Sequence, residues 1–269
     1  MKNDYLTQKK PLSALIVFAL PMIVGNLFQQ TYTMADSAIV GRLVGEDALA
    51  AVGASYALTN VFICIAVGGG VGASVIVSRH FGAKEYSRMK LAVSTAFLTF
   101  LAVSILLAAF GLAFCRQIML ALHTPPEVLD MAVQYLGIYF CGLPFLFMYN
   151  VISSMFNALG KSRIPLCFLV FSSLFNIGLD LVLVQRFCLG VAGVAWATLI
   201  AQGLSALLSF GVFLYVQKKL ECGKTGIFDK KELADMTRIA LPSILQQSII
   251  SIGMMLVQSV VNGFGPQAL

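Results

Sequence analysis

Charge is scarce in this sequence. Asp, Glu, Lys and Arg together make up 11% of the 269 residues, whereas hydrophobic residues make up 59%. A soluble domain carries about 25% charged residues, so this chain has too few of them to cover a surface that faces water. The composition therefore excludes an ordinary soluble domain and indicates a protein that lies in a lipid bilayer.

Histidine is almost absent, and the cysteines follow no metal-binding pattern. His80 and His123 fall in predicted loops on opposite sides of the membrane, so they cannot form a metal pair, and we interpret His80 as a solvated loop residue. The sequence has no HExxH motif, and its six cysteines form no CxxC pair. We therefore expect no cofactor. A disulfide between Cys115 and Cys188, which both lie near predicted outer loops, is left open.

Long apolar runs are what the chain does have. A spanning helix needs about 20 predominantly apolar residues, and seven segments meet this requirement, so the predicted fold class is an all-α membrane protein. The second segment contains Gly68, Gly69, Gly70 and Gly72, which we interpret as a close helix contact rather than a hinge. The predicted spans are 13–38, 48–78, 91–114, 131–156, 165–185, 191–216 and 239–261.

Basic residues alternate between the two sides of the predicted spans. The net charge of +6 would suit a nucleic-acid partner, but these charges lie in short loops between apolar runs. With the N-terminus inside, 15 of the 18 Lys and Arg residues are cytoplasmic, and Arg42, Arg116 and Arg186 are the outer exceptions. Cytoplasmic loops carry such an excess. We expect a multi-pass protein of the inner (plasma) membrane with a cytoplasmic N-terminus and no nucleic-acid partner.

Residues 239–269 repeat residues 18–49 in outline. The segment Ile239–Pro242 (IALP) echoes Phe18–Pro21 (FALP), so each copy is expected to begin an apolar helix with a proline in its first turn. Six predicted helices separate the copies. Because six is an even number, the two repeats are expected to be parallel, as in secondary transporters built from two lobes that enclose a central site.

The repeat also sets the predicted domain organisation. We predict an N-terminal six-helix lobe (1–216), a cytoplasmic linker with a short amphipathic helix (217–238), and the first helix of a second lobe (239–269). Asp229 is the predicted N-cap of the linker helix. We expect the chain to be the N-terminal half of a larger protein. Its last helix should be poorly placed, because the lobe to which it belongs is missing.

Two carboxylates fall well inside the predicted spans, Asp36 in the first and Asp180 in the fifth. A buried carboxylate costs at least about 2.5–3.5 kcal/mol on insertion scales, so each marks a functional site unless hydroxyls and amides satisfy it purely for packing. Two acids in one low-dielectric cavity cannot both ionise easily, so we expect them to titrate as a unit. Polar residues follow helical spacing on three helices: Gln29, Thr33 and Asp36; Ser172, Ser173, Asn176 and Asp180; and Thr198, Gln202 and Ser205.

The surroundings of both acids resemble one known family. Residues 30–42 (QTYTMADSAIVGR) and 45–51 (GEDALAA) are similar to a signature of the multidrug and toxic compound extrusion (MATE) family, in its bacterial and archaeal branch with a helix-one acid. Residues 176–180 (NIGLD) and 190–198 (GVAGVAWAT) resemble its fifth-to-sixth helix signature. The resemblance implies twelve helices in two lobes that export organic cations in exchange for protons or sodium ions, rather than an enzyme.

The resemblance also implies roles for single residues. It makes Pro21 a hinge that bends the first helix with the charge state of Asp36, while a helix-start proline is left open as the alternative. The expected partners of the protein are the bilayer, small organic cations and the missing C-terminal lobe. The implied cation site consists of Asp36, Asn176, Asp180 and Thr198. The predicted drug cavity is lined by Gln29, Asn150, Ser153 and Gln202.

Two other functions are kept as alternatives. The chain has Asn157 before Gly160 where the family often has Arg, so the resemblance does not fix its lining residues or its substrate preference. Lipid-linked oligosaccharide flippases share the fold, but they need internal cations to hold a diphosphate, and no predicted span of this chain supplies one. An intramembrane aspartate enzyme would carry YD and GxGD motifs. The contexts of Asp36 and Asp180 match neither.

Overall fold

The computed structural model describes residues 11–122, 124–218 and 226–263, and in these ranges the chain is helical with short connections. Two of the α-helices are extended by a π-helical turn, η1 after α2 and η2 after α6. The elements are α2 (Pro11–Ile39), η1 (Val40–Val44), α3 (Glu46–Gly82), α4 (Tyr86–Ala121), α5 (Pro126–Ala158), α6 (Arg163–Leu181), η2 (Val182–Arg186), α7 (Gly190–Lys218) and α8 (Lys230–Gly263).

The predicted fold class is confirmed. Each of the seven predicted spans lies within a helix or a helix with its π turn. Among the described residues, six stretches are long and apolar enough to cross a membrane, one for each α-helix from α2 to α7, with η1 and η2 included in the first and the fifth. Large apolar side chains such as Leu12, Leu27, Met34 and Leu106 are mostly exposed, which suits helices surrounded by lipid.

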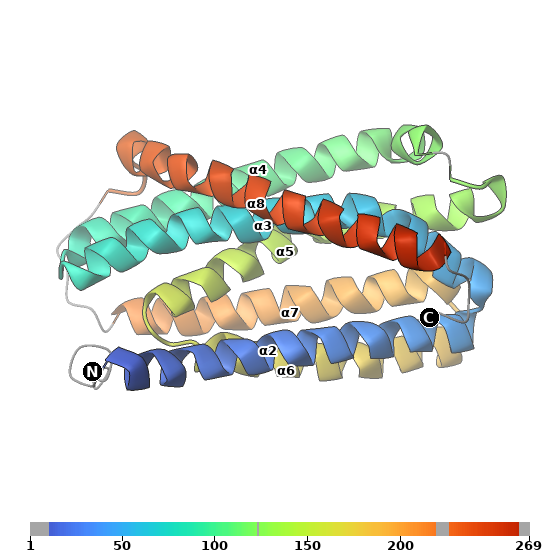
Figure 1. The fold of residues 1–269 in the computed structure, drawn as a ribbon, viewed down its shortest axis with the longest axis horizontal. Helices are drawn as coiled ribbons and strands as arrows, with labels where there is room; N and C mark the ends of the chain where they lie inside the picture. The colour runs from blue at the N-terminus through green and yellow to red at the C-terminus, as the bar shows by residue number, and fades with distance from the viewer. Residues whose placement is uncertain (1–10, 123, 219–225, 264–269) are drawn as a thin grey trace.

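The helices lie side by side along their long axes (Figure 1). α3 packs against α4, α5 and α8, and α5 packs against α4 and α7, so these two helices form the centre. α2 lies at the edge and packs mainly against α6. The buried core is rich in Phe and Met, including Phe140, Phe147, Phe156, Phe213 and Met155.

The glycine-rich run of α3 is a packing surface, as predicted. A Cβ atom at Gly68 would lie 2.6 Å from the Cα atom of Ile244, and one at Gly72 would lie 2.6 Å from the carbonyl oxygen of Met236. Both neighbours are backbone atoms of α8. Small residues of this kind allow two membrane helices to approach closely.

The linker and the last helix differ from the prediction. Asp229 does cap a helix, because its Oδ1 accepts hydrogen bonds from the backbone N–H groups of Lys231 at 2.6 Å and Glu232 at 3.3 Å. However, the expected separate surface helix is wrong: it is the first part of α8, which continues to Gly263. The expectation of a poorly placed last helix does not hold for its described part, because α8 packs along α3 and Ile244 lies against Gly68. Residues 264–269 lie outside the described part of the chain.

Both prolines of the repeat lie inside helices rather than at their starts. Pro21 lies ten residues after Pro11 in α2, and Pro242 lies twelve residues after Lys230 in α8. The expectation of a proline in the first turn is therefore wrong for both copies. An interior proline leaves the carbonyl four residues earlier without its usual N–H donor.

Two smaller expectations are settled by position. Cys115 and Cys188 are both free thiols, so the possible disulfide is absent. His80 is not a solvated loop residue, since it lies in the last turn of α3 and is 9% exposed. The predicted second span ended at residue 78, whereas α3 continues to Gly82 and so includes His80. His123 lies outside the described residues.

Candidate functional site

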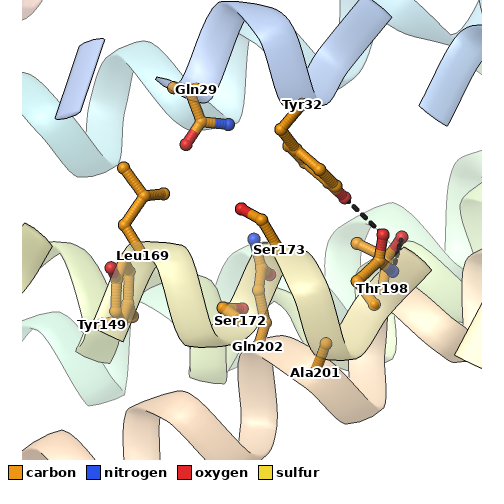
Figure 2. Close-up of a pocket in the computed structure, with 10 residues that line it drawn as sticks. Gln29, Tyr32, Tyr149, Leu169, Ser172, Ser173, Thr198, Ala201 and Gln202 are labelled. Atoms are coloured by element: carbon orange, nitrogen blue, oxygen red, sulfur yellow. Dashed lines mark hydrogen bonds between the residues drawn. The ribbon is translucent and has the colours of Figure 1, made fainter. Parts of the chain in front are cut away.

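Polar side chains from α2, α5, α6 and α7 meet in a small pocket. Figure 2 shows Gln29 and Tyr32 directed from α2 toward α6, with Gln202 on the α7 side. The pocket has a volume of about 60 Å³, whereas sites for drug-sized molecules occupy about 300–1,000 Å³. It can hold an ion or a few waters. Its lining residues are Gln29, Tyr32, Tyr149, Leu169, Ser172, Ser173, Asn176, Thr198, Ala201 and Gln202.

Asp36 and Asp180 lie next to each other beside this pocket. Their carboxyl groups are within hydrogen-bonding range of one another. Asp180 is fully buried, and Asp36 is half-buried. In each carboxyl group, Oδ1 is buried and has no hydrogen-bond partner among the described residues. Because a buried polar atom without a partner is costly, the pair is suited to hold a proton or a small cation.

Asn176 connects the acids to the neighbouring helices. Tyr32 Oη lies 2.6 Å from the Asn176 amide, and Thr198 Oγ1 lies 3.4 Å from its other end. The surroundings favour the orientation in which Asn176 Nδ2 donates to Asp180 Oδ2 at 3.0 Å and to Tyr32 Oη, while its oxygen accepts from the Thr198 backbone N–H at 3.0 Å. In this orientation the amide holds Asp180 from one side.

The four residues of the predicted cation site are therefore brought together from α2, α6 and α7. Within this set of four, the buried atoms without a partner among the described residues are Asp36 Oδ1 and Asp180 Oδ1, which leaves the acids free to bind a further group. Within the described ranges, no cluster of three His, Cys, Asp or Glu side chains is arranged to hold a metal ion.

Tyr32 is the residue that sequence reasoning missed. The predicted stripe on the first helix ran through Thr33, but the Thr33 hydroxyl is exposed and donates to the carbonyl of Gln29 at 3.0 Å. Tyr32 faces the site instead. Its position four residues before Asp36 places both side chains on one helix face, so the signal was present in the spacing.

Two of the four predicted drug-cavity residues line the pocket, and the other two do not. Gln29 and Gln202 line the pocket. Asn150 and Ser153 do not belong to its lining, and Asn150 Nδ2 donates to the carbonyl of Leu146 in its own helix at 2.8 Å. The α5 residue that does line the pocket is Tyr149, next to Asn150. The cavity role of all four residues stays a prediction.

Comparisons with known proteins agree on one family. The family model MatE matches residues 21–182. The probable multidrug resistance protein YpnP of Bacillus subtilis is 31% identical over 98% of this chain and 59% of its own length. Crystal structures of MATE in the straight and bent conformations superpose with TM-scores of 0.87 and 0.85, each at 26% identity. They cover 98% and 97% of this chain and 59% and 58% of the matched chains. The chain thus spans about three-fifths of the length of these relatives.

Proposed function

Because the chain belongs to the multidrug and toxic compound extrusion (MATE) family, we propose that it forms the ion-binding lobe of a secondary antiporter. The complete transporter would export organic cations in exchange for protons or sodium ions. The observation that carries this proposal is the pair of buried, unpartnered carboxylate oxygens of Asp36 and Asp180. No enzymatic role is proposed.

The proposed cycle uses the acids as an exchangeable charge. With one proton shared between the two carboxyl groups the pair carries a single negative charge, and a further proton or a sodium ion neutralises it, so an organic cation gains little by approaching it. After the ion leaves, the uncompensated negative charge attracts the organic cation in a low-dielectric surrounding, where the attraction is strong. Because the ion and the organic cation bind to the same negative charge, they compete for it. This competition couples their opposite movements.

The organic cation needs more room than the pocket offers. We propose that it binds in a cavity between this lobe and a second one, with Gln29, Asn150, Ser153 and Gln202 on the near wall. Gln29 is exposed on α2, which has few neighbours other than α6. The ten residues that line the small pocket include no Lys or Arg, which gives a diphosphate-carrying lipid no counter-charge there.

The same proposal includes an orientation in the plasma membrane. Arg79, Lys84 and Arg88 gather at the corner between α3 and α4, where Arg79 and Arg88 are exposed. An excess of basic residues marks the cytoplasmic side, so we place this corner and the N-terminus in the cytoplasm. The first ten residues lie outside the described part of the chain.

Proteoliposomes test the proposed function directly. Vesicles that contain the complete two-lobed transporter should release ethidium only when an inward proton or sodium gradient is imposed, because the acids need an ion to exchange. Residues 1–269 alone should release none, since alternating access needs two lobes. Release without any gradient would contradict antiport. Full transport by residues 1–269 would mean that the chain assembles with another copy of itself.

Pro21 is proposed as a hinge in α2. Matched crystal structures are described as bent and straight conformations of a MATE protein, and Pro21 lies within α2, fifteen residues before Asp36. An interior proline costs a helix about 3 kcal/mol, which would change a straight–bent equilibrium about a hundredfold. We expect Pro21→Ala to slow gradient-driven ethidium release severalfold and to alter its pH dependence.

Pro126→Ala is the matched control for the hinge. Pro126 is the first residue of α5, where the missing N–H of proline has no helical partner to lose. This variant should transport ethidium at the parental rate. If Pro21→Ala also leaves both the rate and its pH dependence unchanged, Pro21 has no mechanical role.

A further inference from the structure

His80 lies between two carboxylates that come from different parts of the chain. Its Nδ1 lies 3.0 Å from Oε2 of Glu85, in the turn between α3 and α4. Its Nε2 lies 3.1 Å from both carboxylate oxygens of Glu232, in the first turn of α8. The side chains of His80 and Glu232 are 11% and 13% exposed, whereas that of Glu85 is 48% exposed.

The chemistry of these contacts determines the form of the ring. Carboxylates only accept hydrogen bonds, so both ring nitrogens must carry hydrogen for both contacts to be made, and the imidazole is then a cation between two anions. Arg88 approaches Glu85 to 4.0 Å and adds a second positive charge at the exposed end. The two carboxylates lie at opposite nitrogens, so they cannot share a metal ion with one side of the ring.

The cluster closes one end of a long helix contact. α3 and α8 run side by side (Figure 1), and their contact includes Cys64 Sγ, which lies 3.3 Å from Ser251 Oγ. It continues through Gly68 and Gly72, whose missing side chains admit the backbone of α8. His80 is the last contact residue of α3 in this series, which we call the α3–α8 seam. The seam is otherwise built from small and apolar groups.

We propose that His80 is a charge latch that holds the cytoplasmic end of the α3–α8 seam closed. The proposal rests on the proposed function, in which α8 begins the second lobe and the two lobes separate at one side of the membrane and then at the other. Glu85 belongs to the same lobe as His80 and orients the ring. Glu232 belongs to α8, so its contact with Nε2 joins the two lobes, and opening this end of the seam requires that contact to break.

Among the described residues, the His80–Glu232 contact is the ion pair that joins α3 to α8. Apolar contacts between glycine and isoleucine give little directional resistance to separation, whereas hydrogen bonds between charged groups are short and about twice as strong as neutral ones. The cap at Asp229 also fixes the start of α8, because the Asp229 backbone N–H donates to Thr95 Oγ1 at 3.0 Å. The first turn of α8 is thus held at two points, by the neutral hydrogen bond to Thr95 and by the charged contact with His80.

Hydrogen exchange measured by mass spectrometry tests the latch in the 269-residue chain, held in lipid nanodiscs. In His80→Gln and in Glu232→Gln, amides of residues 226–240 should exchange about tenfold faster, because a charged hydrogen bond no longer opposes local opening. The matched variant Glu85→Gln removes the other carboxylate of the same ring. It should leave these amides within about twofold of the parent, since Glu232 still holds Nε2.

Two results would overturn the proposal. One is unchanged exchange over 226–240 in both His80→Gln and Glu232→Gln. The other is equal loosening in Glu85→Gln, which would mean that the cluster supports the α3–α4 corner rather than α8. Peptides from residues 126–181 serve as the internal reference for an intact fold. Because no transport is measured, a failure of the antiport proposal cannot be mistaken for a failure of the latch.

Discussion

Asp36→Asn and Asp180→Asn should each reduce drug resistance to the level of a strain without the transporter. Asparagine has nearly the shape of aspartate but cannot release a proton or neutralise a sodium ion, so either substitution removes one of the two carboxylates that together hold the exchanged ion. The two carboxyl groups lie within hydrogen-bonding range of one another, and each has a buried oxygen without a partner among the described residues. Ethidium efflux and growth in the presence of drug measure the effect in cells that carry the complete transporter.

Stability distinguishes a functional pair from a structural one. A carboxylate in the membrane interior costs at least about 2.5–3.5 kcal/mol, so its replacement by a neutral amide should leave the melting temperature unchanged or raise it. A pair retained for packing would instead lose stability. Asp47→Asn is the matched control, because Asp47 is exposed in the first turn of α3, and it should retain full resistance. Parental efflux by both Asp36→Asn and Asp180→Asn would disprove the site.

Gly68→Ala and Gly72→Ala should both detach α8 from α3. The added Cβ atoms would lie 2.6 Å from backbone atoms of α8, and backbone atoms cannot move aside as the end of a flexible side chain can. Overpacking of this kind costs about 1–3 kcal/mol per site, so the double variant should melt at a clearly lower temperature in detergent. Residues 226–240 should also exchange their amide hydrogens faster.

Gly53 provides the matched control for this pair. It lies in the same helix, and a Cβ atom there would meet nothing within 4 Å. Alanine favours a helix over glycine by about 1 kcal/mol, so Gly53→Ala should keep or raise the melting temperature. A Gly68→Ala, Gly72→Ala variant that melts together with the parent would show that α8 adjusts its position without cost.

The helices could be predicted because length and hydrophobicity are properties of a single segment. The same holds for Asp36 and Asp180, whose charge stands out in an apolar run. The choice between Tyr32 and Thr33 could not be made in this way. Both fit the spacing between Gln29 and Asp36, and the partner that decides between them, Asn176, lies 144 residues from Tyr32. The hydroxyl of Thr33 donates a hydrogen bond to a carbonyl of its own helix, so it does not require a partner in the site.

His80 and the start of α8 were misjudged for a related reason. Charges at Arg79 and at Arg238 end the hydropathy signal, yet both residues lie inside helices, α3 and α8. A helix continues through charged residues where they reach the membrane surface or find partners. For His80 the partner is Glu232, 152 residues away, and no local pattern reveals such a pair.

The helices that carry the two acids both end in a π-helical turn. η1 follows Asp36 by four residues and η2 follows Asp180 by two, and Val40 and Val184 of these turns pack in one buried cluster. A π turn closes between residues five apart, where an α turn uses four, so each segment contains one surplus residue. If a π turn moves one residue along its helix, the side chain that it passes rotates by about 100°. The surplus residues therefore give both acid-bearing segments a way to change their helical register locally while the surrounding helices stay in place.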